Sequence, residues 1–151
     1  MSEMLGNHYF QLKNYLLAEH TYEKLSSKEL SEPKILKRLI ICYTQTYKLE
    51  KALKLFLQLI ENDINTIIRT KQDEEFCPCN ELISQIEKGD FKYENKFQTY
   101  IALGILWMYC NYKTSLTYFK MAINEVPANL LIKKAITVIE NYSNQISIKS
   151  N

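Results

Sequence analysis

A pattern that returns after 34 residues constrains the fold of this chain more than any other feature. The first copy has Leu, Tyr, Ala and Tyr at positions 5, 9, 18 and 22, and the second has Leu, Tyr, Ala and Phe at positions 39, 43, 52 and 56. A fixed period of this length indicates one supersecondary unit copied along the chain. Such units stack side by side and build a binding surface more often than a catalytic centre.

The composition favours helices as the parts of this unit. Only three Gly and three Pro occur among the 151 residues, which is too few turn residues for an all-β fold. The helical spacing of apolar residues predicts helices over 2–12, 15–26, 33–46, 48–61, 64–72 and 80–88. We expect the first of these to bury Leu5, Tyr9 and Leu12. Pro33 should lie in the first turn of the third helix, after a cap at Ser31.

A third, looser copy lies near the C-terminus, with Leu103, Gly104, Phe119, Ala122 and Pro127. Its internal turn is one residue shorter than that of the first copy. The stretch 63–94 between the clean copies is irregular, with an acidic loop at 73–75 and a helix stopped by Gly89. After the third copy, a last helix is predicted to end at about residue 143.

These copies resemble the tetratricopeptide repeat, whose pattern is L-G-x-x-Y, then A-x-x-x-F, then P. Gly6 and Gly104 match the Gly of the pattern, while Ile40 replaces it in the second copy; in the third, Trp107 stands for the Tyr and Ser115 for the Ala. The resemblance implies an all-α fold of antiparallel helical hairpins stacked as a right-handed superhelix (an α-α solenoid). It also implies a concave groove, lined by the first helix of each pair, that holds a peptide or helix of a partner protein.

On this reading residues 1–144 form a single domain. It comprises repeats at about 1–30, 33–63 and 95–127, an irregular helical hairpin inserted at 64–94, and a C-terminal capping helix at 128–143. Residues 145–151 are expected to form a polar tail.

The family alignment gives the groove a basic end and an apolar end. The expected lining residues are Asn7, Phe10, Gln11, Lys34, Lys37, Arg38, Ile41, Gln45, Ile101, Ile105, Met108 and Tyr109. A partner segment of acidic and apolar character suits them. A chaperone-tail clamp, which some family members build from basic groove residues, is not expected, because Glu3, Ile101 and Ile105 stand at those positions. Two plainer interpretations stay open: the lysines are a solvated face, and the isoleucines and Met108 are core covered by the irregular stretch.

Other kinds of function have weaker support in the sequence. Cys77 and Cys79 could supply two ligands of a zinc site, but their spacing is unusual and no second pair is evident, so we expect a turn held by Pro78 and no metal. No phosphate loop, metalloprotease motif or nucleophile elbow is present, so we expect neither an enzyme nor a cofactor.

The remaining expectations concern location and alternative partners. No secretory signal is visible and the longest apolar run, 100–110, is about half a membrane span, so a cytoplasmic location with reduced thiols is expected. The basic stretch 34–54 suggests, as an alternative, a helical repeat that binds single-stranded nucleic acid. A further alternative is self-assembly, or attachment to an upstream domain, through an uncapped outer face of the first helix. The basic residues of the stretch 34–54 are Lys34, Lys37, Arg38, Lys48, Lys51 and Lys54.

Overall fold

The computed structural model describes residues 3–26, 32–70 and 78–150, and within these ranges every regular element is a helix. The helices are α1 (Glu3–Gln11), α2 (Tyr15–Ser26), α3 (Pro33–Gln45), α4 (Leu49–Asp63), α5 (Asn65–Ile68), α6 (Cys79–Glu87), α7 (Lys96–Trp107), α8 (Tyr112–Glu125) and α9 (Leu130–Ser150). The all-α fold class expected from the sequence is therefore confirmed. Within the described ranges no helix is both long enough and apolar enough to span a bilayer.

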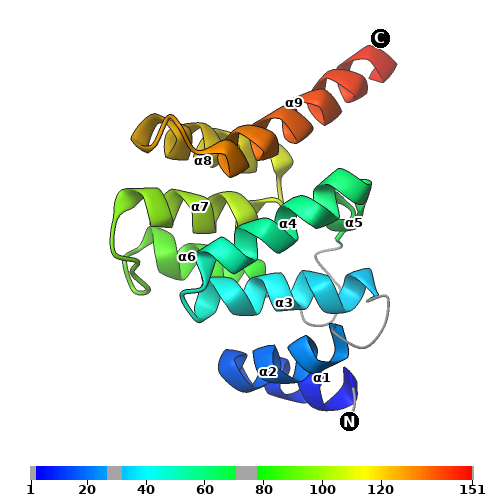
Figure 1. Cartoon of the computed structure of the whole chain (residues 1–151), viewed down its shortest axis with the longest axis vertical. Coiled ribbons are helices and arrows are strands. Elements are labelled where there is room, and N and C mark those ends of the chain that lie inside the picture. The colour runs from blue at the N-terminus through cyan, green and yellow to red at the C-terminus, as the bar shows by residue number, and fades with distance from the viewer. Residues whose placement is uncertain (1–2, 27–31, 71–77, 151) are drawn as a thin grey trace.

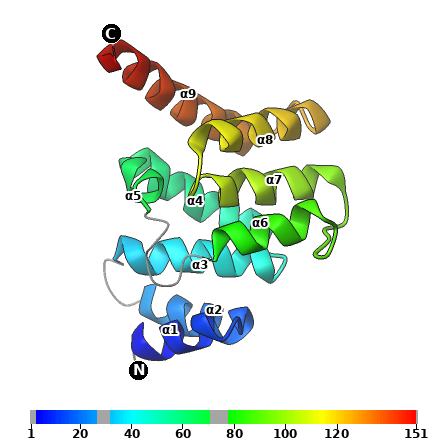
Figure 2. The ribbon, with the colours of Figure 1, turned by 180° about the vertical axis from the view of Figure 1, so that it is seen from behind.

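The helices pack chiefly with their neighbours in sequence. α1 pairs with α2, α3 with α4, and α7 with α8; α2 then packs on α3, and α4 packs on α7. Figure 1 shows these pairs one above another, from α1 and α2 at the N-terminal end to α8 and α9 at the C-terminal end. α9 packs on both α8 and α4, and its C-terminal part extends beyond the other helices in both views (Figures 1 and 2).

Two glycines let paired helices cross closely. A Cβ atom on Gly6 would lie 2.7 Å from the ring of Tyr22, and one on Gly104 would lie 2.9 Å from the ring of Phe119. Both rings are fully buried. Ser115 also lies at the α7–α8 crossing, where its hydroxyl donates to the Gly104 carbonyl at 2.5 Å. The glycines of the repeat pattern thus make room for the aromatic ring of the partner helix.

The turns inside the first two pairs have the same conformation. Lys13 and Tyr47, 34 positions apart, have φ angles of 63° and 65°. The amide that follows each of them donates to a carbonyl five residues back, Asn14 to Tyr9 and Lys48 to Tyr43, both at 2.9 Å. This is the bonding of a helix that ends on a left-handed residue.

The face of α1 that packs against α2 differs from our prediction. Gly6 and Phe10 are buried there, and the Phe10 ring lies 6.3 Å from that of Tyr22 between centroids. Leu5 and Leu12, predicted inward, are 41% and 64% exposed. In an α-helix residues 6 and 10 are one turn apart, so a hairpin that buries them directs residues 5 and 12 to the side.

Other boundaries also differ. α9 continues to Ser150 instead of ending near 143, because residues 144–150 contain no Gly or Pro to stop it. α5 is a single turn, shorter than the predicted helix over 64–72. Pro33 lies in the first turn of α3 and Gly89 ends α6 with a φ angle of 82°, both as predicted. Ser31, Cys77 and the acidic loop at 73–75 lie outside the described residues.

Candidate functional site

The apolar residues expected to line the groove are core residues in the structure. Each is at most 5% exposed: Phe10, Ile41, Ile101, Ile105, Met108 and Tyr109. α6 packs against α7, and Figure 2 shows it lying between α3 and α7. The Tyr109 hydroxyl donates to the Lys37 carbonyl at 2.6 Å, which ties the end of α7 to α3. In this arrangement these side chains are not available to a partner. For Ile101, Ile105 and Met108 the plainer interpretation as core residues describes them better, whereas Phe10, Ile41 and Tyr109 were expected only in the groove.

Two polar residues of the expected groove are also engaged inside the protein. The Asn7 side-chain oxygen accepts one hydrogen bond from the Tyr22 hydroxyl and one from Arg38 Nη1, both at 2.6 Å. Arg38 is only 7% exposed, and a buried guanidinium needs such a partner. Burial raises the pKa of Tyr22 to about 12, against a lowering by the positive charge of Arg38. Asn7 and Arg38 thus hold α1, α2 and α3 together.

The other four expected groove residues keep some exposed surface. Gln11 and Lys34 are exposed, while Lys37 and Gln45 are half-buried. Gln45 donates to the neighbouring Thr44 hydroxyl at 3.2 Å. None of the four lines the pocket described next, so a role for them in binding stays a prediction.

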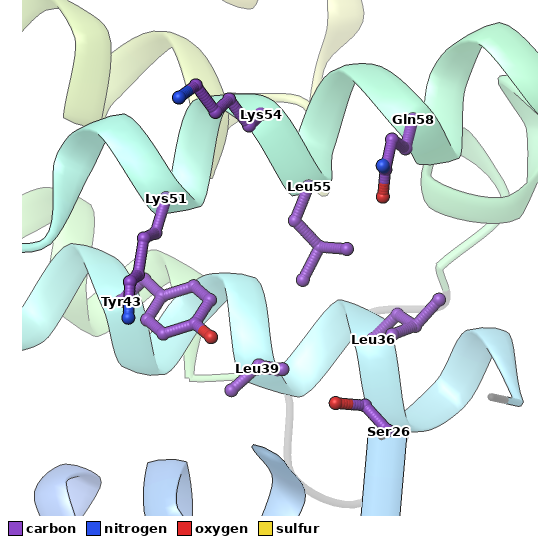
Figure 3. A pocket seen from close by; sticks show the side chains of 8 residues that line it. All are labelled: Ser26, Leu36, Leu39, Tyr43, Lys51, Lys54, Leu55 and Gln58. Atoms are coloured by element: carbon purple, nitrogen blue, oxygen red, sulfur yellow. The ribbon is translucent and has the colours of Figure 1, made fainter. Parts of the chain in front are cut away.

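A pocket of about 510 Å³ opens between α3, α4 and the end of α2 (Figure 3). Residues 36, 39 and 43 of α3 and residues 51, 54, 55 and 58 of α4 are spaced at helical intervals, so each set forms one face of its helix. The lining residues are Ser26, Leu36, Leu39, Tyr43, Lys51, Lys54, Leu55 and Gln58. Figure 3 shows Leu55 directed from α4 toward α3 and Lys51 beside the Tyr43 ring.

The floor of this pocket is apolar and its rim is basic. Leu39 and Tyr43 are buried at its base, and Leu36 and Leu55 are half-buried. The Tyr43 hydroxyl donates to Glu23 Oε2 at 2.6 Å. Burial, together with the hydrogen bond to Glu23 and its negative charge, raises the pKa of Tyr43 above the usual range of a phenol. The floor therefore stays uncharged at physiological pH.

The two rim lysines have loosely held partners, of which Glu23 is half-buried and Glu50 is exposed. Lys51 Nζ lies 3.8 Å from Glu23 Oε2 and 5.8 Å from the centroid of the Tyr43 ring. Lys54 Nζ lies 3.1 Å from Glu50 Oε1, one helical turn away. The lysine side chains are 62% and 60% exposed. Ion pairs of exposed lysines contribute about 0–1 kcal/mol each, so a carboxylate from outside can compete for both ammonium groups.

The sequence contained a signal for this pocket that we did not use. Lys51 and Lys54 entered the sequence analysis only as part of the basic stretch 34–54. On a helix, residues 51, 54, 55 and 58 form one stripe, in which Leu55 lies beside two lysines and Gln58. That stripe indicates an amphipathic surface.

Two other cations of the basic stretch pair inside the fold. Glu19 is fully buried, and its carboxylate accepts from the Thr46 hydroxyl at 2.5 Å and from Lys48 Nζ. With Arg38 bonded to Asn7 and Lys48 to Glu19, two of the six cations donate hydrogen bonds within the fold. This leaves a smaller basic surface than the sequence suggested.

The cysteines that the structure describes do not gather into a site. Cys42 and Cys79 are buried, and Cys110 is half-buried with its thiol 3.4 Å from Asn80 Oδ1. Burial raises the pKa of the Cys42 thiol well above its usual range, which keeps it protonated and unreactive. Among the described residues no three His, Cys, Asp or Glu side chains are grouped so that they could hold a metal ion. Cys77 is outside that part of the chain.

Comparisons of the chain with protein-family models, with curated proteins and with solved structures find no match. The resemblance to the tetratricopeptide repeat therefore depends on the residues quoted above.

Proposed function

We propose that this chain is a non-catalytic protein-interaction module, an adaptor or scaffold, built from stacked hairpins of the tetratricopeptide type. Its partner is a short segment of another protein, bound in the pocket between α3 and α4. A cytoplasmic location belongs to the same proposal. The observation that carries it is the pairing of an apolar floor, formed by Leu36, Leu39 and Leu55, with exposed Lys51 and Lys54 at its rim.

The repeat packing supports the family part of this proposal. Gly6 and Gly104 each lie beneath an aromatic ring of the partner helix, at the positions where the family pattern has its Gly and Phe. Lys13 and Tyr47 give the first two hairpins the same turn. Equivalent packing at equivalent positions is what copies of one supersecondary unit produce.

The chemistry of the pocket defines the partner. An apolar side chain such as Leu or Phe would be buried between α3 and α4, which contributes about 1.5–3 kcal/mol. One or two carboxylates beside it would meet Lys51 and Lys54. Together these terms support a weak contact, suited to a segment that is bound and released. A segment of the same acidic and apolar character was expected from the sequence, but in the groove lined by the first helix of each pair and not in the pocket between α3 and α4.

The proposal can be tested with peptides selected on the intact chain. A random 12-residue display library would be enriched on the wild type, and a labelled peptide from it titrated by fluorescence anisotropy. We expect selected sequences to combine an apolar residue with Asp or Glu. Reversing both rim charges (Lys51→Glu with Lys54→Glu) should weaken binding at least about tenfold, equivalent to 1.4 kcal/mol.

A matched control is Lys133→Glu with Lys134→Glu, which makes the same change in net charge at two exposed lysines of α9. Equal affinity of the rim variant and this control would place the site elsewhere. An oligo-dT probe run in parallel addresses the nucleic-acid alternative. Oligo-dT binding that falls steeply with salt and is lost in the rim variant would replace the proposal by phosphate recognition.

A further inference from the structure

The first hairpin exposes a set of large apolar side chains. Met4 is 79% exposed, Leu5 41%, Leu12 64%, Leu16 52% and Leu17 42%. They come from α1, from the turn after it, and from the first turn of α2. We refer to these five residues as the N-terminal face.

The repeat itself shows what four of these five positions do in this fold; the counterpart of the fifth, Leu16, is the exposed Glu50, which pairs with Lys54 of its own helix. The residues 34 positions after Met4, Leu5, Leu12 and Leu17 are Arg38, Leu39, Thr46 and Lys51. In the second hairpin each of these packs toward the first hairpin. Arg38 donates to Asn7 at 2.6 Å, and Thr46 donates to Glu19 at 2.5 Å. Lys51 lies 3.8 Å from Glu23, and Leu39 is 2% exposed in α3, which packs on α2. At these four positions a hairpin packs against the hairpin that precedes it in the sequence.

The chemistry at these positions differs between the two hairpins. In the second hairpin three of the four are polar or charged, and they meet polar groups of the first hairpin. On the N-terminal face all four are apolar. An acidic segment of the kind proposed for the pocket therefore does not suit the N-terminal face, whereas another apolar surface does.

The apolar N-terminal face is more complementary to a second copy of itself than to α9, the helix at the other end of the stack. On α9 the exposed apolar residues are Leu130 at one end of the helix and Ile146 and Ile148 at the other, and the exposed residues between the two ends include Lys133, Lys134 and Asn141. Head-to-tail stacking would press apolar side chains onto these polar groups. A two-fold arrangement brings each N-terminal face onto its own copy, which requires no other complementary surface.

The size of the face is consistent with such a pairing. Five side chains exposed to this degree present on the order of 500 Å² of apolar surface, at the upper end for the largest patch of a monomer. Two faces together bury roughly 1,000 Å² before their rims are counted, and specific interfaces begin at about 1,200 Å².

We propose that the N-terminal face is a self-association surface and that two copies of the chain pair through it about a two-fold axis. This inference is independent of the function proposed for the pocket between α3 and α4. That pocket is lined by the second hairpin and by Ser26 at the end of α2, and it stays open in the pair. A dimer of this kind carries two such pockets and holds two partner segments at once.

Sedimentation equilibrium of the intact chain from 1 to 300 µM tests the inference. We expect the wild type to populate a dimer within this range. Leu12→Glu with Leu17→Glu places four carboxylates in the paired interface and should weaken dimerisation at least tenfold. The control, Leu130→Glu with Ile148→Glu, introduces the same number of carboxylates at exposed positions of α9 and should leave the dimer unchanged.

Three results would overturn the inference. One is a wild type that stays monomeric at 300 µM, which would assign the face to a different protein. Another is dissociation by the α9 control, and the third is growth beyond dimers, since both indicate head-to-tail stacking. Circular dichroism shows whether each variant is folded; if the double variant is not, Met4→Glu, at the most exposed position of the face, provides the same test.

Discussion

Replacing Gly104 by Ala should destabilise the fold, although Ala is the better helix former. The added Cβ would lie 2.9, 2.9 and 3.0 Å from three carbons of the Phe119 ring. That ring is fully buried and lies 5.6 Å from the Phe56 ring between centroids. It has no open space to move into, so α7 and α8 must separate.

The magnitude follows from two opposing terms. Forcing an extra carbon into a well-packed contact costs about 1–3 kcal/mol, and three short contacts with a confined ring indicate the upper half of that range. Exchanging Gly for Ala inside a helix returns about 1 kcal/mol. The net loss is about 1–2 kcal/mol in the free energy of unfolding, a decrease of several degrees in Tm for a chain of this length.

Urea unfolding followed by circular dichroism measures this loss as a lower midpoint at unchanged slope. Gly6→Ala should behave alike, since its Cβ would lie 2.7 Å from Tyr22. In a Phe119→Leu background the penalty of Gly104→Ala should shrink by at least about 1 kcal/mol, as a double-mutant cycle would show. A neutral or stabilising effect of both Gly variants would refute the close-crossing explanation.

Two further predictions concern buried ionisable groups. Lys48→Met should lower the free energy of unfolding by about 3 kcal/mol, because it leaves the buried Glu19 carboxylate without its cation. Lys54→Met, at an exposed pair, should lower it by less than about 1 kcal/mol. Equal urea midpoints for the two variants would contradict this. Burial raises the pKa of Cys42 above its ordinary 9.0 and that of Tyr93 above 10.0. The unfolded chain releases these protons first, so stability should be level below about pH 9 and then fall by up to about 1.4 kcal/mol per pH unit for each group. Urea midpoints between pH 7 and 10.5 measure this fall, and a constant midpoint across that range would disprove it.

The helices were predictable from the sequence because the chain has few breakers and its apolar residues recur at helical spacing. Pro33 and Gly89 mark a helix start and a helix end through backbone geometry that only a few residue types favour. The face that α1 buries was not predictable from spacing alone. Leu5 and Phe10 both fit an inward position, and the choice between them depends on where Tyr22 of the partner helix meets Gly6.

The site was harder to predict than the fold, because it depends on contacts between distant segments. Ile105 and Tyr109 belong to the core, and Tyr109 contacts Lys37 of α3, 72 positions away, which nothing in the local sequence specifies. Arg38 is a basic residue in the sequence, but its position next to Asn7 makes it part of the packing. In the pocket, by contrast, Lys51 and Leu55 lie on a single helix, so a search for amphipathic stripes would have found them.

The hydrogen bond from Tyr109 to the Lys37 carbonyl has a consequence for the order in which the chain assembles. It joins residues 72 positions apart, whereas each hairpin brings together residues a few turns from one another. The entropy lost on closing a loop grows with its length, and contacts distant in sequence slow folding. The hairpins can therefore form while the rest of the chain is still open, and the α3–α7 junction closes after them. α6 lies within that loop but directly precedes α7 in the sequence, so the packing of α6 against α7, like that of the hairpins, can precede the closure of the junction.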